Sequence, residues 1–552
     1  MSPKMKSYLA IFGGGAFLFA GMTGWSSFGP ARAVVVSRET TYLEEPLTPD
    51  GRVDYLGYIL EQRREGVTPE NNAAIPIILE TWQGDKSNDQ IGRLQQELGI
   101  EVGVLAAQMP ARYGPELDSQ ISTWAFKKWP VDTVENHRAS FNSYAYVSDA
   151  SNYAWQREAV PPLADWIDQQ APHYEHLEEI DQRDKFYWPA GSWLLPPGER
   201  KFAIDNDAEN SISAALETIF MRSNMRLGEQ DAAGAWRDLQ LGWRLTSMYA
   251  PVPSQAEIET YRRFQTRLML QTHRLLSSGV CEPELLDEIA HFFAQYPLAP
   301  GVEVACDQYA RFRALNSVAY HHKDLITSIE RQLPPETVRL LRLPFDKNAS
   351  LWRVNETYDE LQPILKIEDP AQFDAAAITW NDAALERYRS WSSPRALVAA
   401  ALSQSARGVY LADLTYSGWA SRWLTVKPLD FRYRQLFRLM QVAVALEQYR
   451  AKEGEYPDSL ERLDGVIDKQ LTQDMYLSGQ SLVYEKRPPG FLLYSRYLRG
   501  YDDSGSSDDR NIIEGEWLKP NSDYSYRGDE GYDLVVRYPM PHQFRFEKPR
   551  IR

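Results

Sequence analysis

The stretch from 434 to 463 constrains the fold of this chain more than any other part, because it encodes both a helix and the end of that helix. Apolar residues recur there every three or four positions, the spacing of one helical face, at Leu436, Leu439, Met440, Ala443, Leu446 and Tyr449. Gly454 can adopt the left-handed conformation that closes a helix, and Pro457 cannot continue one. We therefore predict a helix that ends near Gly454, followed by a short second helix that Asp458 caps.

After Leu463 the helical spacing gives way to short apolar segments that are typical of strands. The three segments are 481–484, 491–495 and 533–537, and Pro488-Pro489-Gly490 between the first two predicts a hairpin connection. A sheet of two or three strands is marginal alone and needs a helix to cover one face. We therefore expect the apolar face of the preceding helix to pack on these strands.

Most of the chain before residue 430 has helical apolar spacing, most clearly between 208 and 279. Residues 344–392 are richer in Asp, Asn, Trp and Pro, and this composition predicts an irregular connection. The predicted fold class is mainly α, a multi-helix body with a small C-terminal α+β domain in which one long helix covers a short antiparallel sheet. Four regions are predicted: an N-terminal signal peptide or membrane anchor, a helical and irregular region, a helical body, and the α+β domain, at 1–33, 34–200, 201–425 and 426–552.

The N-terminus has the order of an export signal. Lys4 and Lys6 precede an uncharged apolar run, residues 8–25, and the small-x-small sequence Ala31-Arg32-Ala33 follows. The segment is either a cleaved signal peptide or an uncleaved anchor in the inner membrane, since the run is near the minimum length for a span. Either interpretation predicts a cell-envelope protein that is periplasmic or exported, and the anchor would also contact the membrane through this segment.

Charge and cysteine content limit the possible partners and sites. The net charge of −16 over 552 residues argues against nucleic acid, because neutralising phosphates needs a basic surface. The two cysteines, Cys281 and Cys306, lack the spacing of a zinc site. They form one disulfide or two buried thiols, and the sequence leaves both possibilities open.

Histidine pairs and catalytic motifs give little support for an active site. His173 with His176, and His321 with His322, could ligate a metal, but no His-Glu-x-x-His motif is present and structural histidines are the preferred interpretation. The chain has no nucleophile elbow, Walker loop or dinucleotide-binding glycine motif. With 76 acidic residues, a catalytic carboxylate pair cannot be chosen from sequence. Catalytic residues are therefore unknown, and no cofactor-binding residue is predicted.

An acidic segment, 501–511, could supply the oxygen ligands that a hard cation prefers. The helix, stop and short helix at 434–463 resemble the start of the soluble domain of type II secretion major pseudopilins. Because members of that family bind calcium in the loop after the matching strand, the resemblance implies Asp502, Asp503 and Asp533 as calcium ligands. An EF-hand is rejected because its required central glycine is missing, and a solvated acidic loop is the alternative.

A second resemblance covers most of the chain. Five motifs follow one another along the chain. They are Leu-Thr-Pro-Asp-Gly at 47–51, Gly-Val-Thr-Pro-Glu-Asn-Asn-Ala at 66–73, and motifs at 184–189, 221–228 and 235–239. Together they resemble a family of large uncharacterised exported proteins of planctomycete bacteria. The resemblance implies an architecture and a location outside the cytoplasm, and it implies no chemistry.

The sequence favours an exported, non-catalytic envelope protein with an interaction or structural role and with protein partners in the cell envelope. The alternative is a secreted helical hydrolase that acts on envelope polysaccharide or peptide through a carboxylate pair. A deep cleft with two nearby carboxylates would favour the hydrolase, and a shallow surface would favour the interaction protein.

Overall fold

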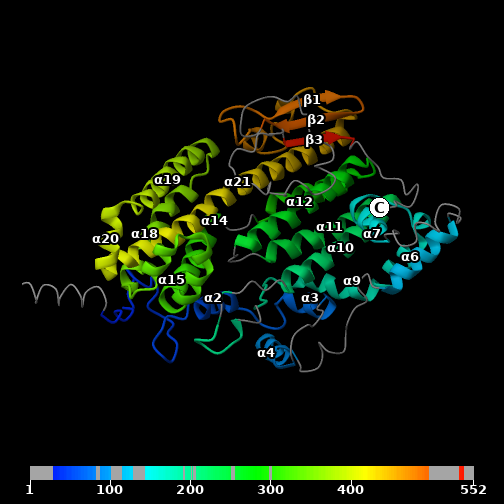
Figure 1. Cartoon of the computed structure of the whole chain (residues 1–552). Helices are drawn as coiled ribbons and strands as arrows, with labels where there is room; N and C mark the ends of the chain where they lie inside the picture. The colour runs from blue at the N-terminus through cyan, green and yellow to red at the C-terminus, as the bar shows by residue number, and fades with distance from the viewer. Residues whose placement is uncertain are drawn as a thin grey trace, which may run out of the picture.

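The computed structural model describes residues 29–81, 88–100, 115–128, 143–189, 193–200, 202, 207–249, 255–297, 301–496 and 534–539. Most of this part is helical, and a three-stranded antiparallel sheet lies near its C-terminal end (Figure 1). The predicted fold class, mainly α with a small C-terminal α+β unit, is confirmed.

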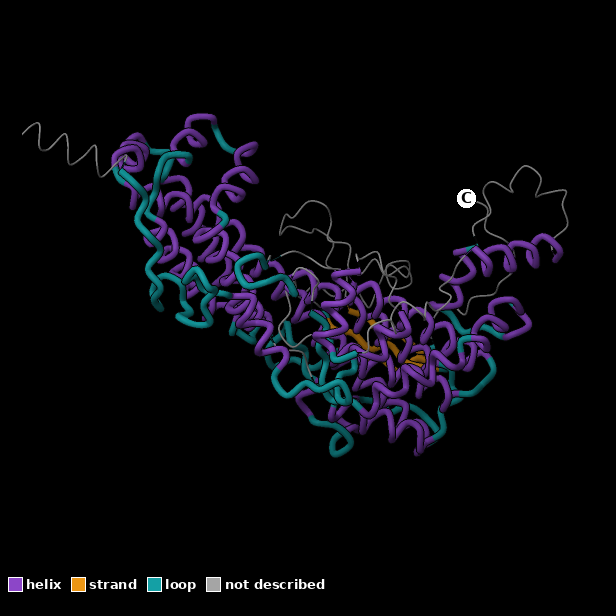
Figure 2. The backbone as a smooth tube through the Cα atoms, turned by 90° about the horizontal axis from the view of Figure 1, so that it is seen from below, coloured by secondary structure: helices purple, strands orange, loops and turns teal. Residues whose placement is uncertain are grey.

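Helices make up both the N-terminal region and the body. The N-terminal helices are α2 (Tyr55–Arg64), α3 (Ala74–Thr81), α4 (Asn88–Leu98), α6 (Pro115–Lys128), α7 (Tyr144–Asn152), α8 (Pro161–Gln169) and α9 (Ala171–Glu178). The first helices of the body are α10 (Asp207–Gly228), α11 (Ala232–Met248), α12 (Gln255–Ser277), α13 (Pro283–Gln295), α14 (Val302–Ala305), α15 (Arg311–Tyr320), α16 (His322–Ile329) and α17 (Pro335–Leu341). The last are α18 (Lys347–Leu365), α19 (Pro370–Ser390), α20 (Pro394–Leu402) and α21 (Gln404–Glu453). Seen from below, the described helices form a curved array (Figure 2).

The organising element is α21, a continuous helix of 50 residues. It begins after Ser403, whose side chain accepts a hydrogen bond from the Ala406 amide, and it ends at Gly454, which has a φ of 84°. The predicted stop is therefore confirmed, but the helix starts 30 residues before Arg434. The expected boundary between 425 and 426 lies inside this helix.

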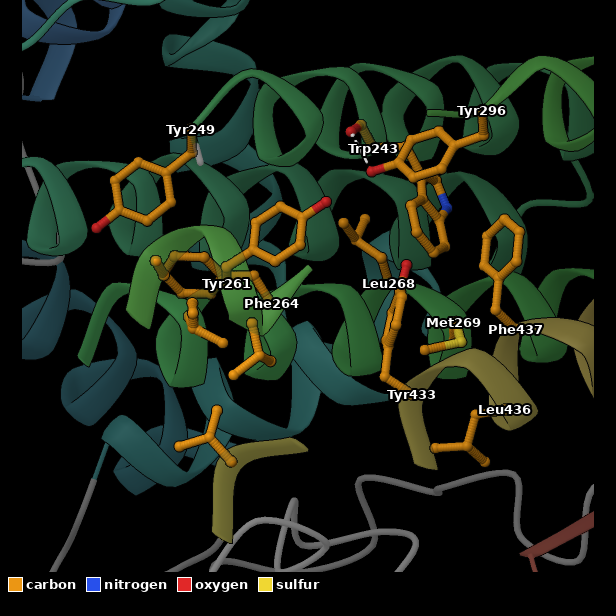
Figure 3. Close-up of a cluster of buried hydrophobic side chains, with 14 of the residues drawn as sticks. Trp243, Tyr249, Tyr261, Phe264, Leu268, Met269, Tyr296, Tyr433, Leu436 and Phe437 are labelled. Carbon is orange, nitrogen blue, oxygen red and sulfur yellow. Dashed lines mark hydrogen bonds between the residues drawn. The ribbon is translucent and has the colours of Figure 1, made fainter. Parts of the chain in front are cut away.

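Both ends of α21 are packed. Near its start it lies against α18 and α20, in its middle against α12 and α13, and near its end under the sheet (Figure 1). In the middle, Trp243 of α11 and Tyr296 after α13 meet Tyr433 and Phe437 of α21 in one aromatic cluster (Figure 3). The Trp243 and Tyr296 ring centroids are 5.0 Å apart, and the Tyr296 hydroxyl donates to the Trp243 carbonyl. The helix is thus held along its length by the body.

The segment 344–392, predicted as an irregular connection, forms α18 and α19 instead. Its aspartates and prolines act as helix starts. Asp346 and Asp369 accept hydrogen bonds from the first-turn amides of α18 and α19, and Pro370 occupies the first position of α19. The prediction was wrong because the same residue types mark turns and helix N-termini.

The predicted cap at Asp458 is also wrong. The short helix after Gly454 is a 3-10 turn at Leu460–Leu463 that follows Ser459. The Asp458 carboxylate instead accepts a hydrogen bond from Lys486 Nζ of the sheet, at 3.0 Å. This contact fixes the turn against the first strand.

The sheet consists of β1 (Val483–Arg487), β2 (Gly490–Ser495) and β3 (Leu534–Tyr538), with β2 in the centre. Arg487 pairs with Gly490, so the hairpin turns at the two intervening prolines, as predicted. α21 contacts β2 and β3, and Leu446 of α21 and Phe491 and Leu493 of β2 are all buried. The expected packing of this helix on the C-terminal sheet is therefore confirmed for the central strand.

Two further features bear on the sequence predictions. Cys281 is half-buried and Cys306 is buried, and neither is in a disulfide. In the described part of the chain, no helix has the length and apolarity needed to cross a membrane. The apolar run at 8–25 lies outside the described residues.

Candidate functional site

The predicted calcium ligands, Asp502, Asp503 and Asp533, all lie outside the described residues. Across the ranges that the structure describes, no three His, Cys, Asp or Glu side chains are grouped so that they could hold a metal ion. Calcium binding by the chain between β2 and β3 therefore stays a prediction.

His176, His321 and His322 belong to no group of three possible metal ligands among the side chains that the structure describes. His173 and His176 share α9, and His176 is exposed. His321 precedes α16 and His322 begins it. The His322 ring packs edge-on against Phe345 at a centroid distance of 5.5 Å, and partial burial lowers its pKa. A core contact is the better account of His322.

The structure does gather titratable side chains where the C-terminal unit meets the end of α21. The Tyr456 hydroxyl donates to Glu447 Oε1 at 2.5 Å, and Arg450 lies 2.7 Å from Glu447 Oε2. Glu447 is fully buried, and burial raises its pKa, an effect that Tyr456 and Arg450 oppose. Beside this group, His273 Nδ1 of α12 lies 3.0 Å from the hydroxyl of Tyr538 in β3. We call these five residues the junction cluster.

The chemistry of the junction cluster is structural. Both Glu447 carboxylate oxygens are engaged, by Tyr456 and by Arg450. Nearby, burial raises the pKa of Cys281 to about 12, so its thiol stays protonated and is a poor nucleophile. The turn at Gly454 returns the chain toward α21, which is why Tyr456 reaches Glu447. The sequence predicted that turn. It could not predict the contact of His273 with Tyr538, because the two residues are 265 positions apart.

The neutral state of His273 makes the junction sensitive to acid. Burial lowers the pKa of His273 from 6.5 to about 4. Because the folded state binds this proton less well than the unfolded state, the stability from neutral His273 is complete above pH 6.5 and is lost as pH falls toward 4. The loss should reach at most about 3 kcal/mol. Between pH 6.5 and 4 the melting temperature should change less with pH for His273→Gln than for the unchanged protein.

The raised pKa of Glu447 makes stability fall as pH rises, which is opposite to the effect of His273. Because Glu447 is present in both proteins, the difference between His273→Gln and the unchanged protein reports on His273. An exposed histidine on α13, His291, provides the matched control. His291→Gln should retain the pH dependence of the unchanged protein. If His273→Gln retained it as well, the neutral, partly buried histidine would not be the cause.

Three arginine–carboxylate pairs are among the other buried polar groups, and each of the three joins two helices. They are Arg222 with Asp238 between α10 and α11, Arg262 with Asp430 between α12 and α21, and Arg353 with Asp413 between α18 and α21. These aspartates are buried and each is engaged by at least one arginine. Among the described residues they tie helices together and do not present a catalytic pair.

A small cavity near the start of α2 is lined by Arg52, Asp54, Arg200 and Tyr320, among others. Its volume of about 30 Å³ accommodates one or two water molecules. Its aspartate is already engaged, because Asp54 caps α2 and lies 2.6 Å from Arg200 NH1. This cavity offers neither the size nor the two carboxylates that a polymer hydrolase requires.

Comparison of the chain with family models, with curated proteins and with solved structures found no match. The resemblances to pseudopilins and to exported planctomycete proteins therefore stay predictions.

Proposed function

We propose that the protein is an exported, non-catalytic component of the cell envelope that acts as a rigid spacer. Its N-terminal segment, residues 8–25, holds it to the inner membrane, and its C-terminal α+β unit is presented to protein partners at a fixed distance. The single observation that carries the proposal is the continuous helix α21, which runs from a contact with Gly29, where the described chain starts, to the C-terminal sheet.

One end of α21 adjoins the start of the described chain. The side chain of Gln404, the first residue of α21, donates a hydrogen bond to the Gly29 carbonyl at 2.8 Å. The apolar run ends at Trp25, four residues earlier. An anchor at 8–25 would therefore hold the first turn of α21 close to the membrane.

The other end of α21 carries the sheet. Gln435 accepts a hydrogen bond from the Met475 amide at 2.8 Å, and the junction cluster fixes the last turn of the helix. At 1.5 Å per residue, the 50 residues of α21 span about 75 Å. Because buried ion pairs and aromatic contacts fix the helix to the body, this distance is maintained.

Fractionation of cells that produce the full chain with a C-terminal tag tests the location and the anchor. We expect the tagged protein in the membrane fraction, resistant to alkaline extraction, and degraded when protease is added outside the inner membrane. A chain without residues 1–28 is the matched control and should remain in the cytoplasm, because the deletion removes the export segment and leaves the described residues intact. Recovery of the full chain as a soluble cytoplasmic protein would contradict the proposal.

A further inference from the structure

Four large apolar side chains are exposed at the end of the molecule where the described chain starts. They are Val35, Trp352, Val398 and Leu402, with exposed fractions of 58%, 49%, 57% and 55%. Single exposed apolar residues are common on soluble proteins, so their position decides whether they have a role.

Hydrogen bonds place these residues around the start of the described chain. Asn348, in the first turn of α18, donates to the Ala33 carbonyl at 2.9 Å and accepts from the Val35 amide at 2.8 Å. Trp352 lies one helical turn beyond Asn348, on the same face of α18. The described chain begins at this end of the molecule, beside α18 and α20 (Figure 1).

Helix α20 has an unusual composition for a surface helix. Its sequence is PRALVAAAL, and Ala400 is its only buried residue. Val398 and Leu402 are one turn apart and therefore share a face. Leu402 is two residues before Gln404, which contacts Gly29. The exposed face of α20 thus adjoins the start of the chain.

The occupant of this surface follows from the distance to the apolar run. Trp25 and Gly29 are four residues apart, which an extended chain spans in at most about 14 Å. If residues 8–25 are in the bilayer, this end of the fold cannot lie far from the lipid headgroups. Arg32 and Arg395 are exposed beside the apolar residues and would meet anionic headgroups.

We propose that α20 and the first turns of α18 rest on the surface of the lipid bilayer, with Val35, Trp352, Val398 and Leu402 inserted at headgroup level. This inference rests on the membrane anchor of the proposed function and adds a second contact made by the fold itself. A helix that lies in the interface, beside the anchor, would set the orientation of α21 relative to the membrane.

The test uses the full chain in vesicles of phosphatidylethanolamine and phosphatidylglycerol. An environment-sensitive dye is attached through Val398→Cys or Leu402→Cys, and through Val466→Cys as the matched control. Val466 is 50% exposed and lies beyond the other end of α21. The unsubstituted chain, treated with the same dye, measures labelling of Cys281 and Cys306.

We expect dye at 398 and 402 to show a blue-shifted emission and several-fold stronger quenching by nitroxide-labelled lipid than dye at 466. Flotation of the same samples reports separately on the anchor. If the protein floats with the vesicles but all three positions are quenched equally, the docking surface is wrong and the anchor stands. If the protein does not float, the proposed anchor fails and the docking surface fails with it.

A second copy of the chain is another possible occupant of this surface. In that case the dye at 398 and 402 would be shifted without lipid, to an extent that grows with protein concentration, and nitroxide-labelled lipid would not quench it. That result would overturn the membrane assignment.

Discussion

An Asp430→Ala variant should lose about 3–5 kcal/mol of stability, because it leaves a buried arginine without its carboxylate. Asp430 lies in α21 and is fully buried, and it pairs with Arg262 of α12, whose side chain is 5% exposed. Arg434 lies 2.9 Å from the second carboxylate oxygen, but it also pairs with Glu368 at 2.6 Å and so keeps a partner in the variant. Most of the lost stability is therefore the cost of burying Arg262 without the Asp430 carboxylate.

Hydrogen exchange of peptides from α12 and α21 measures this effect locally, which matters because a chain of 552 residues need not unfold in one step. Asp168→Ala removes the carboxylate of an exposed pair with Arg157 and should cost less than about 1 kcal/mol. The combination of Arg262→Met with Asp430→Leu should be more stable than Asp430→Ala, since it removes both buried charges. Equal losses in all three variants would show that burial of the arginine is not the cause.

Local spacing was sufficient to predict the helical class, the stop at Gly454 and the three strands. Each of these depends on residues that are close in sequence, so the physical cause is present in a short window. The prediction for 344–392 was wrong because it also used only a short window. Within that window, Asp369 and Pro370 look the same at a helix start as in a loop.

The polar groups at the centre of the molecule could not be predicted. Arg262 and Asp430 are 168 residues apart, and no local pattern marks either as buried. The start of α21 at Gln404 was missed because the segment before Arg434 is buried on several sides and shows little one-sided apolar spacing. Tertiary packing supplies both features.

At the proposed site on α20, the sequence suggests burial and the structure shows exposure. The sequence of residues 396–402 is apolar, and a helix with apolar residues on all sides is normally buried. The structure exposes Val398 and Leu402 instead. Gln404, two residues after Leu402, contacts Gly29, and nothing in the sequence indicated this proximity. The proximity makes the exposed face of α20 a candidate membrane surface.

Replacing Leu446 by alanine should destabilise the attachment of the C-terminal sheet by about 2–5 kcal/mol, through lost transfer free energy and the cavity that remains. Leu446 is fully buried near the end of α21, in the cluster that also contains Phe491 and Leu493 of β2. A small sheet depends on this helix for a covered face, so the loss should be concentrated there.

Hydrogen exchange distinguishes a local from a global effect. Amides of β2 should lose protection by about 30-fold or more, the factor that corresponds to 2 kcal/mol, while α18 at the far end of α21 should keep its protection. Leu385→Ala makes the same change at a leucine of α19 that is 45% exposed, and it should alter stability by less than about 0.5 kcal/mol. Unchanged protection of β2 in Leu446→Ala would mean that the sheet is held independently of α21. The spacer function would then lose its physical basis, since the helix would no longer fix the position of the unit it is proposed to present.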